Sequence, residues 1–312
     1  MRAIVTGGAG FIGSHIVDVL AEHGDEVHVL DNLATGRREN VHARAVLIEG
    51  DVREAETVYS LFDRVRPEAC FHLAAQADVR VSVERPDLDC TVNVLGTVHV
   101  LEAARRHAAK VVLSSTGGAI YGECERPAPE DSPRLPLSPY GASKLAAEEY
   151  LATFGRLYGN GGVALRYGNV YGPRQDPHGE AGVVAIFLGL LATGGRPRIF
   201  GDGRQTRDYV YVADVAAATL AALDRNGGVF NVGTGRETSV LELFDVCRRV
   251  ASSAVEPELA PARPGELARS VLDPELSARE LGFRSATSLE DGLRATWEWI
   301  RKQEGTEPKR KR

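Results

Sequence analysis

The stretch Ile4-Val5-Thr6-Gly7-Gly8-Ala9-Gly10-Phe11-Ile12-Gly13 decides the fold of this chain. Its first three residues read as a short buried strand, and the apolar residues 16–20 that follow read as a helix. Glycines in the turn between them allow a tight bend, a close approach of backbone to a pyrophosphate and close packing of helix on strand. The helix N-terminus would face the phosphates. We therefore predict a dinucleotide site with contacts at Gly7, Gly10, Phe11, Ile12 and Gly13.

A second strand is expected at residues 27–30, and it ends in Asp31. A carboxylate at about this distance from a glycine-rich turn binds the adenosine ribose of a dinucleotide. Its negative charge repels the 2′-phosphate of NADP, so the sequence predicts NAD as the cofactor. Arg37 and Arg38 keep NADP open as the alternative, because guanidinium groups bind phosphate well.

Strand and helix patterns alternate through the rest of the first half. We expect strands at 45–49, 69–73, 110–113 and 163–166, and helices at 54–65, 88–107 and 140–158. Such alternation predicts an α/β fold with a doubly wound parallel (Rossmann) sheet. Binding sites in these sheets lie beyond the carboxyl ends of the strands, so the loops after Leu73, Leu113 and Arg166 are the informative ones.

The pattern becomes irregular after about residue 168, where glycine and proline interrupt it. A helix near residues 214–223 and strands near 198–200 and 229–232 are expected there. We therefore divide the chain into an NAD-binding domain over residues 1–167 and a smaller mixed α/β substrate-binding region over residues 168–303. Segments of that region can return to the first domain. Residues 304–312 are expected to form a disordered basic tail.

The composition is that of an ordinary globular protein, with 43% hydrophobic and 26% charged residues among 312. The net charge is −6 although the last four residues are basic, and this acidic body argues against a nucleic-acid partner. No apolar run is long enough to span a bilayer and no signal peptide precedes the first strand, so we expect no membrane partner and a cytoplasmic location.

The cysteines and histidines show no pattern of a metal site. No C-x-x-C spacing occurs among the four cysteines, which fits reduced thiols rather than a disulfide framework or a zinc site. The eight histidines are not clustered. We therefore assign no metal to the chain.

Tyr140 and Lys144 form a candidate catalytic pair. Before Arg301 the chain uses only two lysines, Lys110 and Lys144. Residues four apart share one face of a helix, and an ammonium group near a phenol lowers the pKa of the phenol. Taken alone, the spacing fits a chance pair on a solvated helix equally well. The dinucleotide turn favours the catalytic interpretation, in which the tyrosine acts as a base.

Thr116 is the third candidate catalytic residue. The strand that ends at Leu113 opens into Ser114-Ser115-Thr116-Gly117-Gly118, which places a hydroxyl at a carboxyl end of the sheet, beside the expected nicotinamide. For the other two hydroxyls, at Ser114 and Ser115, turn hydrogen bonds are a good explanation.

These residues together resemble the extended short-chain dehydrogenase/reductase family and, within it, the UDP-galactose (UDP-glucose) 4-epimerases. The resemblance covers residues 1 to about 300. Besides the glycine turn and the Thr116, Tyr140 and Lys144 set, it rests on Asp31-Asn32, Asp51-Val52, Leu73-Ala74-Ala75, Arg166-Tyr167-Gly168-Asn169-Val170-Tyr171-Gly172-Pro173, Arg207-Asp208-Tyr209-Val210, Asn231-Val232-Gly233-Thr234-Gly235 and Arg263-Pro264-Gly265-Glu266.

The resemblance implies bound NAD and a UDP-sugar substrate. The implied cofactor contacts beyond the glycine turn are Asp31, Asn32, Asp51, Val52, Leu73, Ala74, Ala75, Gln76, Asn93, Tyr140, Lys144 and Tyr167. The implied substrate contacts are Asn169, Arg207 and Arg263 at the diphosphate, Ile199 and Phe200 near uracil, Glu266 near the uridine ribose, and Thr116, Tyr140 and Ser270 at the sugar. Serine at position 270, where relatives can hold tyrosine, implies room for an N-acetyl group.

The implied reaction oxidises and re-reduces the same sugar carbon. Tyr140 would take the proton of the 4-hydroxyl while NAD accepts hydride from C4, and the hydride would return to the other face of the 4-keto sugar. Lys144 would hold the nicotinamide ribose, and Thr116 would hydrogen-bond the reacting oxygen. In relatives, the helices at 88–107 and 140–158 also form the interface of a homodimer. A row of leucines that faces the core of a single chain would explain the leucines of these helices equally well.

Three other functions share parts of this pattern. Nucleotide-sugar 4,6-dehydratases commonly follow the threonine with acidic residues, whereas Gly117 and Gly118 follow Thr116 here. UDP-glucuronate 4-epimerases tend to have threonine and arginine at the places of Asn169 and Asp176. A dinucleotide-sensing protein without catalysis would commonly lose the tyrosine and lysine pair. The sequence therefore favours a UDP-hexose 4-epimerase.

Overall fold

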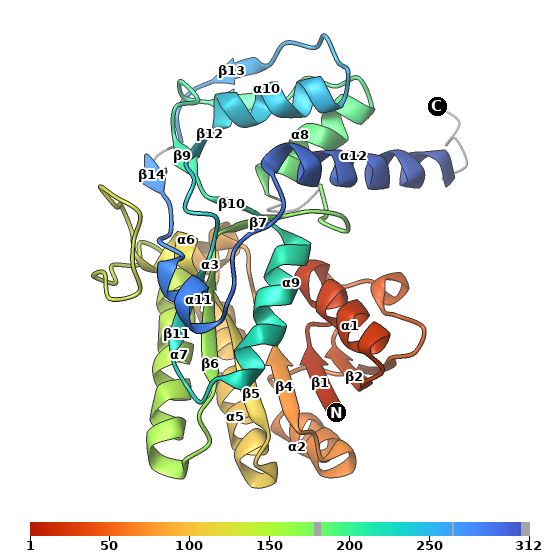
Figure 1. The fold of residues 1–312 in the computed structure, drawn as a ribbon, viewed down its shortest axis with the longest axis vertical. Helices are drawn as coiled ribbons and strands as arrows, with labels where there is room; N and C mark the ends of the chain where they lie inside the picture. The colour runs from red at the N-terminus through yellow and green to blue at the C-terminus, as the bar shows by residue number, and fades with distance from the viewer. Residues whose placement is uncertain (178–181, 264, 307–312) are drawn as a thin grey trace.

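The computed structural model describes residues 1–177, 182–263 and 265–306. Its centre is a seven-stranded parallel sheet in the order β11-β6-β5-β4-β1-β2-β3 (Figure 1). The strands are β1 (Arg2–Thr6), β2 (Glu26–Asp31), β3 (Val46–Glu49), β4 (Ala69–His72), β5 (Lys110–Thr116), β6 (Val163–Tyr167) and β11 (Val229–Val232). The strand order reverses at β1 and β4, where such sheets open a crevice for ligands. The predicted doubly wound parallel sheet is confirmed.

Helices cover both faces of this sheet. They are α1 (Phe11–His23), α2 (Ala55–Val65), α5 (Gly96–His107), α7 (Pro139–Tyr158) and α9 (Val212–Ala221). α1 and α9 share one face, where Ile16, Leu20 and Val215 pack in one apolar cluster with strand residues. α2, α5 and α7 share the other face, where Phe62 and Leu151 belong to a second cluster. Apolar burial on both faces explains why the strands read as continuous hydrophobic runs.

The helix predicted at residues 88–107 begins earlier and is not uniform. It starts as α4 (Pro86–Cys90), widens into the π-helical turn η2 (Thr91–Leu95) and continues as α5. Proline suits the first helical position because the N–H that it lacks would have no helical partner there. Asn93 lies in the π-turn and is buried. Such turns inside α-helices frequently occur at functional sites.

The second half forms a smaller region at the carboxyl ends of the sheet strands (Figure 1). Its apolar core involves the helices α8 (Val183–Ala192), α10 (Val240–Val250) and α12 (Leu289–Thr306). Its short strands are β7 (Asn169–Tyr171) with β10 (Tyr209–Tyr211), β8 (Arg198–Phe200) with β13 (Glu258–Ala260), and β9 (Thr206–Arg207) between β12 (Thr238–Ser239) and β14 (Arg269–Ser270). The other short helices of the described chain are α3 (Val79–Glu84), α6 (Gly117–Ile120) and η1 (Arg38–Asn40) in the first half, and α11 (Glu275–Glu280) and η3 (Ala222–Asp224) in the second.

The sequence predicted too few helices in this second region. α8 is an uninterrupted apolar run, and α10 begins with a capping box in which Ser239 and Glu242 each bond the other's backbone. The strand predicted at 229–232 lies beside β6, so the chain returns to the main sheet after leaving it. α12 runs to Thr306, past the predicted start of the tail at residue 304, and residues 307–312 lie outside the described part of the chain. Within the described ranges, no helix has the length and apolar character needed to cross a membrane.

Candidate active site

The glycine turn joins β1 to α1 and leaves the N-terminus of that helix open. Gly7 has a φ of 70°, and a Cβ atom there would lie 2.7 Å from the backbone nitrogen of Ala74. Only glycine meets both conditions without strain. Gly10 precedes the helix, and no side chain caps the first N–H groups of α1. These free N–H groups and the helix dipole make the turn a cradle for phosphate.

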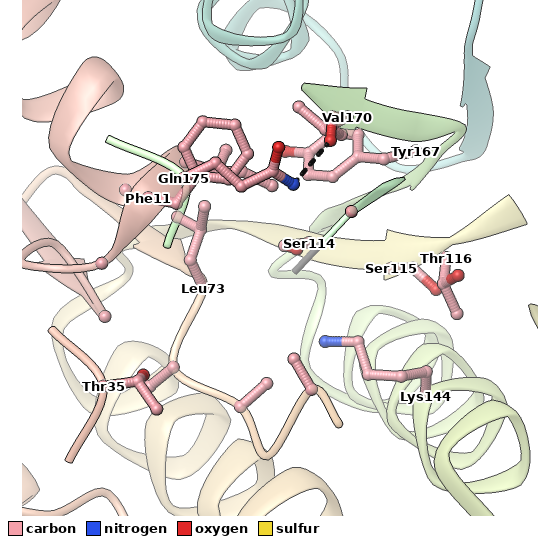
Figure 2. Close-up of a pocket in the computed structure, with 18 of the residues that line it drawn as sticks. Phe11, Thr35, Leu73, Ser114, Ser115, Thr116, Lys144, Tyr167, Val170 and Gln175 are labelled. Atoms are coloured by element: carbon pink, nitrogen blue, oxygen red, sulfur yellow. Dashed lines mark hydrogen bonds between the residues drawn. The ribbon is translucent and has the colours of Figure 1, made fainter. Parts of the chain in front are cut away.

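A cavity of about 460 Å³ lies beside this turn, at the carboxyl ends of the strands. Figure 2 shows the Lys144 amine extending into it from α7. The cavity brings together the predicted dinucleotide turn, the carboxylate after the second strand and the predicted catalytic set. The predicted residues that line it are Gly7, Gly10, Phe11, Ile12, Gly13, Asp31, Asn32, Asp51, Val52, Leu73, Ala74, Ala75, Thr116, Tyr140, Lys144, Tyr167 and Asn169.

Two carboxylates stand where β2 and β3 end. Asp31 accepts a hydrogen bond from the Ala9 N–H at 2.9 Å, so it fixes the glycine turn and also brings a negative charge to the cavity. Asn32 donates to Asp51 at 2.8 Å. Hydrogen bonds from Arg53 lower the pKa of Asp51 to about 2, which keeps this carboxylate ionised at neutral pH. The charge around the ribose position predicted from Asp31 is therefore negative.

Tyr140 and Lys144 line the cavity from α7. Burial raises the pKa of Tyr140 to about 12, although a hydrogen bond with Thr116 acts in the opposite direction. Burial also lowers the pKa of Lys144 to about 8, against the attraction of Glu148 and Asp89. Burial therefore has the largest effect on the pKa of Tyr140 in the protein alone, and the expected role of Lys144 in making this phenol acidic stays a prediction.

Glu148 is a buried carboxylate that the sequence analysis missed. It lies four residues after Lys144, as Lys144 lies four after Tyr140, so the three side chains share one face of α7. Its carboxylate pairs with Arg166 at 2.6 Å and accepts the Ser115 hydroxyl at 2.5 Å. Its charge raises the pKa of Lys144 and so offsets part of the effect of burial. The repeat of four residues was the available signal in the sequence.

Asn93 holds the loop after β4 and does not line the cavity. Its side-chain amide donates to the Gln76 carbonyl at 2.9 Å and accepts from the Gln76 N–H at 2.8 Å. The Gln76 side chain turns toward Asp89, whose buried carboxylate also accepts from Asn93 at 3.0 Å. The direct cofactor contacts predicted at Gln76 and Asn93 stay predictions, because the hydrogen bonds of both side chains lie within the protein. Both residues fix the loop that carries the lining residues Leu73 to Ala75.

Two other predicted residues have partners within the protein. Tyr167 lines the cavity (Figure 2) and is buried. Its hydroxyl bonds the Thr219 hydroxyl at 2.9 Å. Arg37, which kept NADP open as a cofactor, lies 3.9 Å from Asp176. Both of these charged side chains are about half exposed. Arg37 thus has a carboxylate partner within the protein and does not need the 2′-phosphate of NADP as its partner.

The two residues predicted near uracil, Ile199 and Phe200, differ in their surroundings, and Phe200 contacts Arg263, which was predicted at the diphosphate. Arg263 stacks over the ring of Phe200 with its guanidinium carbon 3.9 Å from the ring centroid, and Arg263 is exposed. Ile199 has no exposed surface and its side chain packs in the core of the second region, so its predicted place near uracil stays a prediction. Alternation along β8 sends neighbouring side chains to opposite faces. Pro264, in the same predicted motif, lies outside the described residues.

Arg207 and Glu266 approach each other at the edge of the second region. The Arg207 guanidinium donates to the Leu267 carbonyl at 2.9 Å and lies 3.5 Å from Glu266. These contacts hold the arginine in a fixed orientation, from which its other N–H groups can meet a phosphate. Ser270 follows on β14 and is buried. In the described part of the chain, no three side chains of the His, Cys, Asp and Glu types meet to hold a metal ion.

Comparison with known proteins assigns this site to a family. The family model for the NAD dependent epimerase/dehydratase family matches residues 3–233, which include the glycine turn, the predicted catalytic set and, apart from Arg2, the strands of the main sheet. The chain belongs to this family. The resemblance seen in the sequence is thereby confirmed.

Solved structures of this epimerase/dehydratase family cover nearly the whole chain. A UDP-glucose 4-epimerase from Thermotoga maritima with UDP-glucose is 47% identical, with a TM-score of 0.95 over 97% of this chain and 99% of that one. A UDP-glucose 4-epimerase from Thermus thermophilus in complex with NAD is 49% identical, with a TM-score of 0.91 over 96% and 99%. A UDP-N-acetylglucosamine 4-epimerase from Methanobrevibacter ruminantium, in complex with UDP-N-acetylmuramic acid, is 36% identical, with a TM-score of 0.91 over 97% and 98%.

Proposed function

We propose that the protein epimerises UDP-hexoses at C4 and interconverts UDP-glucose and UDP-galactose with NAD as a retained cofactor. The observation that carries this proposal is the meeting of the glycine turn with Thr116, Tyr140 and Lys144 in one cavity. A dinucleotide site beside a base on a rigid helix supports hydride chemistry at a carbon that bears a hydroxyl. The likeness to epimerases solved with UDP-glucose and with NAD supports the same reaction.

The features of the cavity fit NAD. The open N-terminus of α1 suits the pyrophosphate, and the Asp31 carboxylate suits a ribose with free hydroxyls. Lys144 extends its amine into the same cavity, where it can bond the second ribose. When bound, NAD supplies a positively charged ring that accepts hydride and later returns it.

Tyr140 is the proposed base, and the other two residues control its proton. Because burial raises its pKa to about 12, the Tyr140 phenolate is a strong base once formed. Lys144, with a pKa of about 8, stays mostly protonated at neutral pH, and its positive charge stabilises that phenolate. Thr116 hydrogen-bonds Tyr140 and so keeps the phenol oriented toward the 4-hydroxyl of the sugar.

On the substrate side, the stack of the exposed Arg263 on the partly buried Phe200 suits a planar base with a phosphate nearby. Arg207 and Asn169 would hold the diphosphate, with Glu266 at the uridine ribose. The small side chain of Ser270 would leave space open beside the sugar 2-substituent. We therefore propose that UDP-N-acetylglucosamine and UDP-N-acetylgalactosamine are also substrates.

The direct test is to incubate the purified protein separately with UDP-glucose, UDP-N-acetylglucosamine and UDP-glucuronate, without added cofactor, and to separate the products by chromatography. We expect UDP-galactose from the first sugar, UDP-N-acetylgalactosamine from the second and no product from the third. Mass spectrometry of the denatured supernatant should find NAD, because internal return of hydride leaves the cofactor unconsumed. A 4-keto-6-deoxy product, or NADP as the dominant dinucleotide, would contradict the proposal.

We also propose a cytoplasmic homodimer that acts in galactose metabolism. Leu95 on η2, Val83 on α3 and Tyr150 on α7 are large apolar side chains with exposed surfaces of 44%, 62% and 44%. α3 packs against α7 and η2 packs against α7, so these side chains belong to neighbouring elements on one side of the molecule. The four cysteines are free, which suits a reducing compartment. Analytical ultracentrifugation of the protein and of Leu95→Glu tests the dimer.

A further inference from the structure

Gly118 lies where three polar side chains from different strands converge. A Cβ atom on Gly118 would lie 3.7 Å from Asn169 Oδ1, 3.9 Å from Ser270 Oγ and 4.0 Å from Thr116 Oγ1, and these are its three nearest neighbours. All three distances are ordinary van der Waals contacts. Thr116 ends β5, Asn169 begins β7 and Ser270 ends β14, so the sheet and the second region both contribute to this point.

The requirements of the fold do not explain a glycine at position 118. Gly118 is not among the glycines with positive φ, and it belongs to the helical turn α6, where alanine is more favourable than glycine. Its neighbour Gly117 is different, since a Cβ atom there would lie 2.5 Å from a methyl carbon of Leu272. Packing therefore requires glycine at 117, whereas position 118 has room for a methyl group.

We propose that Gly118 is a specificity-determining residue, whose missing side chain lets a neutral, hydroxyl-bearing sugar ring lie against the backbone between Thr116, Asn169 and Ser270. The identity of this ligand rests on the function proposed above. The surrounding groups are two hydroxyls and one carboxamide, each able to donate and to accept hydrogen bonds. None of the three carries a charge. Such a set suits a hexose or an N-acetylhexosamine, whereas a sugar carboxylate pairs best with a cation.

The substitution Gly118→Ala tests this inference, with Gly117→Ala as its matched control. Calorimetry on the NAD-containing protein would compare the affinity for UDP with the affinity for UDP-glucose, so that only the sugar differs. In Gly118→Ala we expect UDP affinity within about twofold of wild type and UDP-glucose affinity reduced roughly ten- to a hundredfold. The unfolding temperature should stay unchanged. Gly117→Ala should lower the unfolding temperature and weaken both ligands alike.

Several outcomes would overturn the inference. Equal losses for UDP and UDP-glucose in Gly118→Ala, or no loss for either, would show that the methyl group does not meet the sugar. Failure of Gly118→Ala to fold would refute the premise that the protein has room for that group.

Turnover of UDP-glucose by the wild type tests the proposed function separately. A sugar-specific loss of affinity in Gly118→Ala, without turnover by the wild type, would support the sugar site and refute the reaction. Turnover by the wild type, without a sugar-specific loss in Gly118→Ala, would support the reaction and refute the role of Gly118.

Discussion

The main sheet and the second region differ in what holds them together. In the main sheet, seven parallel strands lie between two helical layers, and apolar side chains fill both faces. The second region joins strands of only two or three residues. There the buried Asp208 accepts from the Thr234 N–H at 2.8 Å, the Thr234 hydroxyl at 2.6 Å and the Gly235 N–H at 3.1 Å. The second region thus adds single polar anchors between its short strands and loops to the apolar core that its helices form.

The comparison explains where chemistry and binding reside. The proposed base and its ammonium partner stand on α7 of the rigid sheet, while most proposed contacts to the nucleotide of the substrate lie on short strands and loops. A rigid element positions a reacting group more precisely than a loop does. Substitutions that damage one region and spare the other therefore test this division.

The largest effect is expected for Tyr140→Phe, which removes the base from the sheet side and no contact from the substrate side. Turnover should fall by about a hundred- to ten-thousandfold, whereas UDP affinity should not change. Tyr158→Phe is the matched control, because Tyr158 is exposed at the end of the same helix and outside the proposed dimer surface. Steady-state kinetics and calorimetry measure the two properties. Turnover near that of the wild type in Tyr140→Phe would end the proposed mechanism.

Glu148→Ala should cause the largest loss of stability. It would leave the Arg166 charge buried without its carboxylate, and breaking one side of a buried pair costs about 3–5 kcal/mol. The adjacent Glu149→Ala is the control, since the pair of Glu149 with Arg134 is exposed and such pairs contribute at most about 1 kcal/mol. Urea denaturation of both variants would measure the difference. Equal losses would show that the buried network is not what stabilises the sheet here.

Lys144→Met should increase stability while it abolishes turnover. The pKa of Lys144 falls from 10.5 to about 8, so the folded protein binds this proton less tightly than the unfolded chain does. That difference opposes folding below pH 8 and disappears as the pH rises from about 8 to 10.5. The variant should therefore gain about 1–3 kcal/mol in free energy of unfolding at pH 7. Urea denaturation across this pH range checks the sign, and a gain that does not shrink with pH would contradict it.

Asp208→Ala should loosen the second region and spare the sheet. Each hydrogen bond to a buried carboxylate contributes about 1.5–3 kcal/mol, so the loop at 233–235 should open more often. Hydrogen exchange should become faster there and stay slow in β1, β4 and β5. The nearby exposed Asp202→Ala serves as the control. Uniformly faster exchange throughout the protein would show that the two regions unfold as one unit.

Ser270→Tyr should have the smallest and most selective effect. A tyrosine side chain would fill space beside the sugar 2-substituent, and overpacking of about 1–3 kcal/mol corresponds to a loss of roughly ten- to a hundredfold. Turnover of the N-acetylated sugars should fall by this factor, while UDP-glucose and UDP-galactose should be largely spared. Kinetics on both sugar pairs measures the ratio. Equal losses on both pairs, or no N-acetyl activity in the wild type, would reject an open pocket at Ser270.

The sequence predicted the sheet and the main lining residues because short local patterns determine them. Gly7, Asp31, Tyr140 and Lys144 stand at fixed distances from strand ends or on one helix face, and those distances follow from chain geometry. The sequence could not predict the direction of the pKa shift at Tyr140, since that depends on burial by residues far along the chain. The sequence also could not show that the Ile199 side chain is buried, because a strand of three residues is too short for its inner face to be recognised.

The missed helices have a different cause. α8 is apolar on nearly all sides, so no face of it shows the periodicity that identifies a helix. The role of Gln76 was equally hidden, because the buried carboxylate that turns it away from the cavity comes from a separate helix. Contacts between distant elements decide both features.

The position of β11 at the sheet edge has a consequence for the newly made chain. β6 leaves the ribosome well before residues 229–232 have been synthesised, and β11 is the strand that pairs with its outer side. Until then the nascent chain carries an apolar strand edge, Val163–Tyr167, whose backbone groups are open to other chains. The protein therefore passes through a stage of translation in which its catalytic helix is complete but its sheet is not. Chaperone capture or rapid elongation after Tyr167 would protect the chain at that stage.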